Sequence, residues 1–289
     1  MSPGTKGGAD GRQDAARRWL RRLEAEEKGL GRSLLIVVAH ADDEVIGVGG
    51  QLARLSGVRL VHVTDGAPRD LRDARAAGFD DWQDYAAARR HELLAALRLA
   101  GIEAAQADGL GLPDQGASFR LVELAEVLAA KFSALRPEMV MTHAYEGGHP
   151  DHDATAFAVH AACALVQRRG GAAPALIEMT GYHMGTGEPV KSEFLHRPDI
   201  PVITLVLDDH GRAFKRRLVE CFPTQRRALA DFPIDVERFR PAPAYDFTRP
   251  PHEGRLFYEH FDWGVEGARW RALAGQALAA LEIMGRPCA

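Results

Sequence analysis

Several features that would narrow the class of this protein are scarce or absent in its 289 residues. The three cysteines, Cys163, Cys221 and Cys288, are too widely spaced for a disulfide framework or a structural zinc site. No apolar run approaches the ~20 residues of a membrane span, and the N-terminus lacks the apolar core of a signal peptide. We therefore expect a cytoplasmic protein with no membrane partner. A net charge of −4 provides no basic excess, so nucleic acid is not an expected partner.

Apolar runs of strand length alternate with helical patterns through the first half of the chain. The run Leu34–Val38 is typical of a central parallel strand that is buried on both faces. Further strands are predicted over 58–64 and 137–142, and helices over 45–55, 81–99, 121–135 and 154–168. This alternation predicts an α/β fold, a Rossmann-like three-layer α/β/α sandwich with a mostly parallel sheet.

The two ends of the chain differ from this core. Residues 1–32 are expected to form a mobile N-terminus over 1–12 and an extra helix over 14–28, with Trp19, Leu20 and Leu23 available for docking. Beyond residue 170 the alternation loosens, and no internal repeat is present. There we predict strands over 176–182 and 202–207, and a helix over 210–230 that is interrupted at its proline. The chain thus divides into a core over 33–170 and a C-terminal portion over 171–289.

Two short clusters of histidines and carboxylates each follow a predicted strand. Residues 39–44 read Ala-His-Ala-Asp-Asp-Glu, and residues 149–153 read His-Pro-Asp-His-Asp. Open α/β sheets collect their ligand groups at the carboxyl ends of the strands. Imidazoles and carboxylates bind catalytic metals, which keep three protein ligands and one open position. The sequence therefore predicts a hydrolytic metal site. Residue type alone leaves several candidate ligands open: His40, Asp42, Asp43, His149 and His152.

These two clusters resemble the motifs of the N-acetylglucosaminyl-phosphatidylinositol de-N-acetylase family, also called the LmbE-like or PIG-L deacetylases. The family's first motif is Ala/Pro-His-Pro-Asp-Asp-Glu, and only Ala41 differs here. That change removes a rigid φ but no ligand. The second motif, His-Pro-Asp-His, matches without change. Weaker similarities lie at 61–66, Arg89, Glu92 and 111–114. The resemblance covers roughly residues 33–165.

The resemblance implies a metal site and a domain organisation. It assigns His40, Asp43 and His152 as the ligands of a zinc ion, and iron(II) suits the same ligand set. It also implies one catalytic domain over 33–289, in which residues 171–289 shape the substrate cleft. The expected partner is a small N-acetyl sugar or glycoconjugate.

Catalytic roles follow from the same resemblance. Asp42 is the expected general base that takes a proton from the attacking water, whose pKa a metal lowers toward ~7. A protonated His149 is expected to face the developing oxyanion, and Asp151 to orient that imidazolium. Tyr145, on the turn before His149, is a further candidate hydroxyl donor to the oxyanion.

Some of these residues also have a plain structural interpretation. The acidic run 42–44 suits the first turn of a helix, which accounts well for Glu44. Asp153 is expected to be the N-cap of the helix over 154–168. Arg89 and Glu92 are expected to form an ion pair on their helix. None of these interpretations accounts for the two histidines of the second cluster.

We therefore predict a metal-dependent hydrolase that removes an N-acetyl or related N-acyl group from a glucosamine-containing small molecule or glycoconjugate. The alternatives are an amidase acting on a larger amide, such as a thiol conjugate, and a non-catalytic sugar-binding relative. A dinucleotide site at 47–50 is disfavoured because its glycine spacing is wrong. Trp263 and Tyr258 are candidates for stacking on a sugar, with core packing or a homo-oligomer interface as the alternative.

Overall fold

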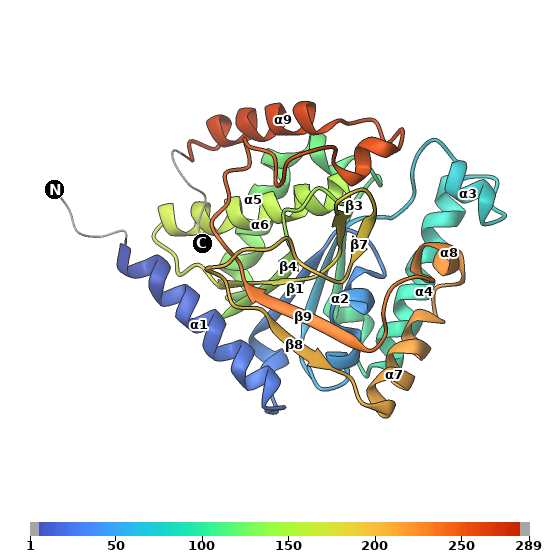
Figure 1. Ribbon diagram of the computed structural model, residues 1–289, viewed down its shortest axis with the longest axis horizontal. Coiled ribbons are helices and arrows are strands. Elements are labelled where there is room, and N and C mark those ends of the chain that lie inside the picture. Colours follow the sequence, from blue (N-terminus) through green and yellow to red (C-terminus); the bar gives the residue numbers. More distant parts are fainter. Residues whose placement is uncertain (1–5, 284–289) are drawn as a thin grey trace.

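The computed structural model describes residues 6–283, with side chains from residue 10 onward. A seven-stranded sheet with the order β3-β2-β1-β4-β5-β9-β8 forms its centre (Figure 1). The parallel strands are β1 (Leu34–Val38), β2 (Arg59–Thr64), β3 (Ala107–Leu112), β4 (Met139–His143) and β5 (Ala175–Met179). The antiparallel strands are β9 (Val236–Pro241) and β8 (Ile203–Val206). A small separate sheet pairs β6 (Tyr182–Met184) with β7 (Pro189–Lys191).

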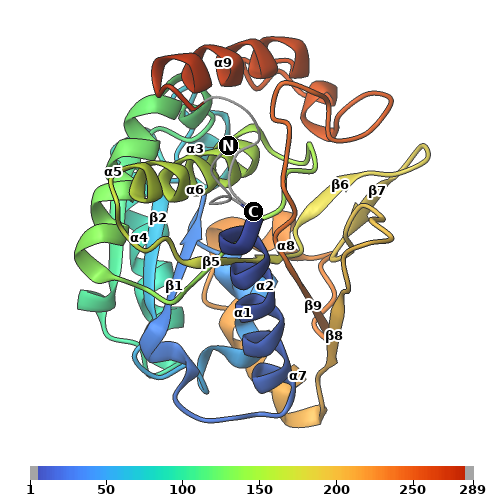
Figure 2. The ribbon, with the colours of Figure 1, turned by 90° about the vertical axis from the view of Figure 1, so that its left-hand side faces the viewer.

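Helices cover both faces of the large sheet, so the predicted three-layer α/β/α sandwich is confirmed (Figures 1 and 2). One face packs against α5 (Leu121–Leu135), α6 (Pro150–Arg168) and α9 (Gly267–Ala280). The other packs against α1 (Lys6–Glu24), α2 (Asp43–Leu52), α4 (Trp82–Leu99) and α7 (Asp209–Val219). The shorter helices α3 (Arg72–Ala76) and α8 (Arg226–Leu229) lie beside α4 (Figure 1).

The unbroken apolar run of β1 follows from this layering. Leu35 and Val37 pack toward α5 and α6, whereas Ile36 and Val38 pack toward α1 and α2. Each of these side chains is at most 1% exposed. A parallel strand between two helical layers has no solvent face, so every position favours an apolar residue.

The helix that follows the second cluster begins earlier than predicted. α6 starts at Pro150, with His149 as its N-cap, because proline is well accommodated in the first turn of a helix. The N-cap prediction for Asp153 is therefore wrong. Its carboxylate lies one turn inside the helix and accepts the N–H groups of Glu146 (3.3 Å) and Gly147 (3.1 Å). Asp153 thus ties the preceding turn to α6.

The N-terminal helix is longer than expected, because α1 begins at Lys6. Its Trp19, Leu20 and Leu23 are at most 3% exposed, so the predicted docking face is confirmed. The first five residues of the predicted mobile segment lie outside the described residues.

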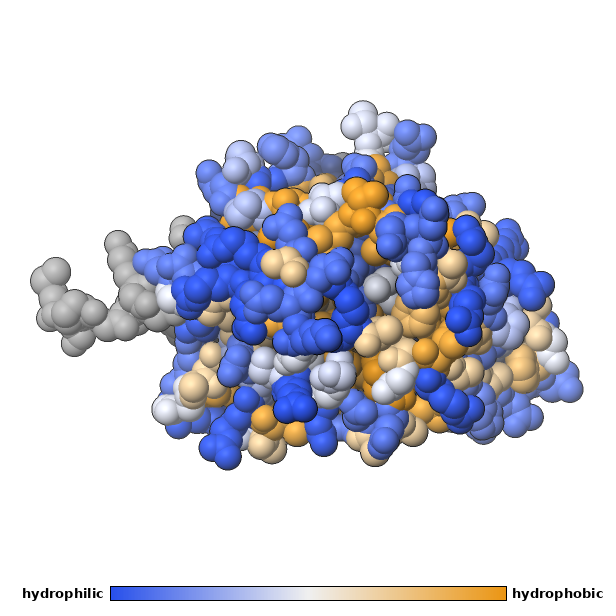
Figure 3. Space-filling model, turned by 90° about the horizontal axis from the view of Figure 1, so that it is seen from below, coloured by the Kyte–Doolittle hydropathy of each residue, from blue (hydrophilic) through white to orange (hydrophobic). Residues whose placement is uncertain are grey.

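Among residues 6–283, no helix combines the length and the apolar character that crossing a membrane requires. In the view of Figure 3, hydrophilic side chains cover most of the face, and apolar side chains gather in limited patches between them.

A buried ion pair joins α2, α7 and β9. Lys215 Nζ lies 2.9 Å from Glu237 Oε1, and both residues are 1% exposed. Lys215 also donates to the Ile46 carbonyl at 2.8 Å. Glu237 accepts from the Gly50 N–H (2.8 Å) and the Gln51 amide (2.9 Å). The two charges are thus compensated only by each other and by the backbone and amide groups around them.

Replacing Lys215 with methionine should lower the free energy of unfolding by about 3–5 kcal/mol, because the carboxylate of Glu237 would stay buried without a partner. Urea denaturation measures this loss. The matched control is Arg169→Ala, which breaks the exposed Arg169–Glu126 pair and should cost at most about 1 kcal/mol. Equal effects of the two substitutions would contradict the importance of the buried pair.

Candidate metal centre and active site

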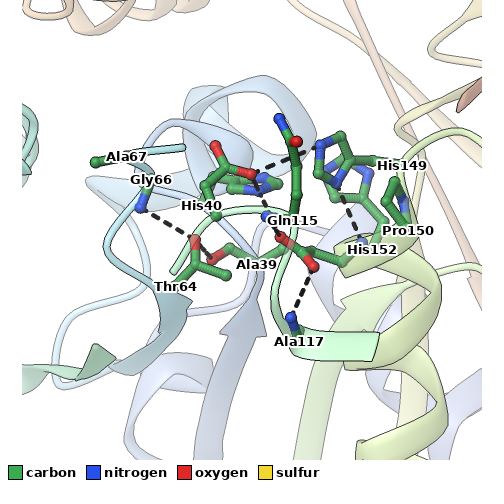
Figure 4. Close-up of polar contacts among 12 residues, drawn as sticks. Ala39, His40, Thr64, Gly66, Ala67, Gln115, Ala117, His149, Pro150 and His152 are labelled. Carbon is green, nitrogen blue, oxygen red and sulfur yellow. Dashed lines mark hydrogen bonds and ion pairs between the residues drawn. The ribbon is translucent and has the colours of Figure 1, made fainter. Parts of the chain in front are cut away.

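Histidines and carboxylates from four segments meet where β1 and β4 end at the same edge of the sheet. His40 follows β1, and Asp43 begins α2. His143 ends β4, and His149 and His152 lie at the start of α6. Figure 4 shows the rings of His40, His149 and His152 turned toward one another beside Gln115. The two sequence clusters are therefore brought together, as their positions after parallel strands predict.

The carboxylate of Asp43 lies between three imidazoles. Its Oδ1 is 3.2 Å from His152 Nε2, and its Oδ2 is 3.4 Å from His40 Nδ1 and 3.3 Å from His143 Nε2. The backbone N–H of His40 also donates to Oδ2 at 2.7 Å. Burial would raise the pKa of Asp43, but the charge of His152 holds it well below its usual value. Asp43 is therefore ionised, the state in which a carboxylate binds metal.

A second pair of carboxylates faces the other side of His40. His40 Nε2 lies 3.2 Å from Asp114 Oδ1 and 3.5 Å from Asp151 Oδ2. Burial would lower the pKa of His40, but the charge and hydrogen bond of Asp114 raise it well above its ordinary value. Conversely, burial would raise the pKa of Asp114, but His40 lowers it. Buried carboxylates therefore contact both nitrogens of this imidazole.

The donor atoms at this point fit a metal ion. Two sets of three residues each hold their donor atoms within 4.8 Å of one another: His40, His149 and His152; and Asp43, His143 and His152. Imidazole nitrogens and carboxylate oxygens are the donors that zinc and iron(II) prefer. All of these residues are less than 9% exposed. A cation placed there would offset the like charges of the buried carboxylates, which are otherwise costly to hold together.

The hydrogen bonds of His149 distinguish it from the other histidines. The backbone N–H of Asp151 donates to His149 Nδ1 at 3.1 Å, so the proton of the neutral ring belongs on Nε2. Burial and the charge of His40 hold the pKa of His149 well below its usual value. The ring of His149 is therefore neutral, in contrast to the protonated state that the resemblance led us to expect. It presents an N–H donor and lines the cavity described below.

The carboxylate of Asp151 does not make the predicted contact with His149. It accepts the N–H groups of Gln115 (2.6 Å) and Ala117 (3.0 Å) and does not orient His149 (Figure 4). Its own backbone N–H orients His149 instead. The reason is that the side chain, in the first turn of α6, points to the turn that carries Gln115.

Asp42 lies beside the donor cluster in an unusual conformation. Its φ of 123° is rarely adopted by residues with a side chain and stores strain. Burial raises the pKa of Asp42 to about 8, although Arg89 opposes this shift. Arg89 Nη2 donates to Asp42 Oδ2 at 2.9 Å, and Arg89 also donates to the carbonyls of Ala41 and Gly66 at 2.7 Å each. The guanidinium thus fixes both the carboxylate and the backbone around it.

The predicted ion pair of Arg89 with Glu92 is wrong. The carboxylate of Glu92 instead accepts from the N–H and hydroxyl of Thr224 (2.9 and 2.5 Å).

Tyr145 does not reach the cluster. Its hydroxyl donates to the Arg249 carbonyl at 2.8 Å, and its ring stacks on Trp270. The side chain follows β4 but turns toward the α6 and α9 layer, where the aromatic core covers it.

Two residues of the cluster, His143 and Asp114, were not predicted as site residues from the sequence. His143 directly follows the strand predicted over 137–142, so its position at a strand end was an available signal. Asp114 ends the Gly-Leu-Pro-Asp segment at 111–114, which carried only a weak similarity. Its contact with His40 depends on how the loop after β3 folds, and the sequence pattern does not determine that path.

The cluster opens into a cavity of about 1260 Å³. Its lining includes His40, Asp42, Asp43, His149 and His152. Trp263 lines the cavity, with its ring centroid 4.6 Å from that of His149. Tyr258, the other aromatic candidate, is 1% exposed and is not among the lining residues. Of the two, only Trp263 can touch a bound molecule in this arrangement.

Comparisons with known proteins agree with this geometry. Residues 35–163 match the family model described as PIG-L, GlcNAc-PI de-N-acetylase. A relative from Saccharopolyspora erythraea, 1D-myo-inositol 2-acetamido-2-deoxy-alpha-D-glucopyranoside deacetylase 1, is 32% identical over 149 residues. That match covers 41% of this chain and 49% of the relative, so it spans about half of the relative's length.

Solved structures share the fold over a longer part of the chain. A deacetylase of the teicoplanin biosynthesis pathway is 20% identical and superposes with a TM-score of 0.56, over 72% of this chain and 96% of that one. The zinc-inhibited form of a teicoplanin deacetylase is 19% identical, with a TM-score of 0.53 over 72% and 97%. At these identities the likeness shows the fold alone. Through its residues 35–163, this chain is thus similar to the PIG-L family of de-N-acetylases.

Proposed function

We propose that this protein is a metal-dependent hydrolase that removes an N-acetyl or related N-acyl group from a glucosamine-containing small molecule or glycoconjugate. One observation carries the proposal: the Asp43 carboxylate contacts both His40 and His152, and these residues line a large cavity together with Asp42. The match of this region to a de-N-acetylase family supports the reaction type. The named activity of the curated relative supports the sugar class.

His40, Asp43 and His152 are the proposed ligands, with zinc as the expected ion and iron(II) as the alternative. When bound, the ion would supply a Lewis acid that polarises the amide carbonyl and acidifies water. His143 has a supporting place, because its ring stacks on His152 at 4.0 Å and its Nε2 accepts the Ala39 N–H at 3.0 Å. That hydrogen bond occupies the lone pair that a metal would need.

Asp42 is the proposed general base. Arg89 holds its Oδ2, which leaves Oδ1 to accept a proton from the attacking water. The same carboxyl can then return this proton to the departing amine. His149 is the proposed oxyanion donor through its Nε2–H, since its Nδ1 is already occupied by the backbone.

Residues 33–289 are proposed to act as one catalytic domain. Arg240, on β9, lies 2.7 Å from Glu178 on β5 and 3.0 Å from Glu146 on the turn before His149. Glu146 also accepts the N–H of Leu195 at 2.8 Å. These buried contacts attach the C-terminal portion to the turn that carries the catalytic residues.

The substitution Asp42→Asn should retain bound metal and reduce acetate release by about 10²–10⁴-fold, because the amide has no basic oxygen. Elemental analysis of the purified protein and an acetate assay on a panel of N-acetylglucosamine conjugates give the two readouts. Wild-type turnover in this variant would remove Asp42 from the mechanism.

The substitution His152→Ala should abolish both stoichiometric metal binding and acetate release, because it removes one of three ligands. His91→Ala is the matched control, since His91 is exposed on α4 and should retain both. Wild-type protein that binds metal but releases no acetate would favour the amidase alternative. Failure of the wild-type protein to bind either zinc or iron would defeat the proposal.

A further inference from the structure

The cavity is larger than an N-acetyl sugar requires. Small-molecule sites commonly occupy ~300–1,000 Å³ and accept drug-sized ligands, whereas this cavity reaches about 1260 Å³. A single acetylated sugar at the metal centre therefore leaves part of the cavity open. The residues that line this remaining part indicate what it accepts. The inference that follows rests on the proposed deacetylase function.

An aromatic wall extends outward from His149 and His152. The ring of Trp263 lies 4.6 Å from His149, and that of Tyr182 lies 5.3 Å from His152. Phe257 joins these two, at 6.4 Å from Trp263 and 5.0 Å from Tyr182. The wall continues to Phe261 and Phe232, and every member lines the cavity: Tyr182, Phe232, Phe257, Phe261 and Trp263.

Phe261 and Trp263 form a stacked pair at the outer end of this wall. Their centroids are 4.6 Å apart and their planes differ by 13°. The side chain of Phe261 is nevertheless 46% exposed, which is unusual for a ring of this size. A nearly parallel pair with an exposed member is a surface that a further flat ring can extend by stacking.

Polar groups also line the cavity. Asp114 contacts His40 of the donor cluster at 3.2 Å, and Arg89 holds Asp42 at 2.9 Å. Gln115 and Thr224 line the cavity as well. Sugar hydroxyls need such hydrogen-bond partners when they are buried. The aromatic wall provides few, because phenylalanine rings carry no donor or acceptor. The polar groups beside the donor cluster and the aromatic wall thus suit two chemically different parts of one molecule.

We propose that the substrate is an aryl glycoside or similar conjugate, whose N-acetyl sugar lies at the metal centre and whose flat aromatic aglycone lies on the wall formed by Phe257, Phe261 and Trp263. Trp263 contacts both regions, since it lies against His149 and stacks on Phe261. The aromatic group therefore begins directly beside the sugar. The wall selects the substrate, whereas the donor cluster performs the reaction.

The test compares N-acetylglucosaminides that carry a para-nitrophenyl, octyl or methyl group on the anomeric oxygen. Acetate release gives kcat/KM for each, and calorimetry on the metal-loaded protein gives Kd. The aryl glycoside should exceed the methyl glycoside by about tenfold or more in kcat/KM, mostly through KM. Stacking energies of aromatic pairs correspond to about a 2–13-fold effect per ring. Trp263→Ala and, separately, Phe261→Ala should reduce the aryl-to-methyl ratio by that factor.

Phe119→Ala is the matched control, because Phe119 is 51% exposed and does not line the cavity, and its ratio should equal that of the wild type. Phe261 is half exposed, so its replacement tests the wall even where the tryptophan variant does not fold. Equal kcat/KM for aryl and methyl glycosides would overturn the inference and leave the deacetylase function intact. A higher kcat/KM for the octyl glycoside than for the para-nitrophenyl glycoside would also overturn it, because the wall would then bind an alkyl chain and not an aromatic ring. If no glycoside releases acetate, the calorimetric aryl-to-methyl ratio still decides whether the wall binds rings.

Discussion

The contact between the Asp43 carboxylate and three imidazoles is the constraint on which the rest of the site depends. It requires the end of β1, the end of β4 and the start of α6 to lie close enough for their histidines to contact the same carboxylate. A parallel sheet achieves this because the carboxyl ends of neighbouring strands share an edge. Any shift of β1 against β4 would separate His40 from His143 and break the set. The packing that buries β1 on both faces and fixes its register with β4 therefore also fixes the relative positions of the site residues.

Burying so much charge places demands on the surrounding structure. The side chains of Asp42, Asp43 and Asp114 are each at most 9% exposed, and each has a guanidinium or imidazole partner. Isolated buried charges would be unfavourable, so these partners are required for the fold as well as for chemistry. Arg89 illustrates the double role. It donates to the Asp42 carboxyl and also binds two backbone carbonyls, which helps to hold the strained φ of Asp42.

The fold was largely predictable because its signals are local and strong. Unbroken apolar runs and alternating helical patterns determined the layers and most strand positions. The tail was not predictable in the same way, since α9 and β9 carry mixed patterns and owe their places to distant contacts. At the site, motif spacing brought together His40, Asp43 and His152. It could not identify Asp114, whose role depends on a loop path, or the outward turn of Tyr145, which depends on packing against Trp270.

The division between predictable and unpredictable parts has a physical meaning. The donor cluster is built from segments that precede residue 163, where strand ends fix side-chain positions within narrow limits. The aromatic wall is built from the β6 strand, the segment around 232, and the segment 257–263, which begins with a single 3₁₀ turn. Loops can change their side chains and paths without disturbing the sheet. A fold arranged in this way can keep one reaction while its later loops adapt to different conjugates. The selectivity that we propose for the aromatic wall would then reside in the part of the chain whose sequence pattern is weakest.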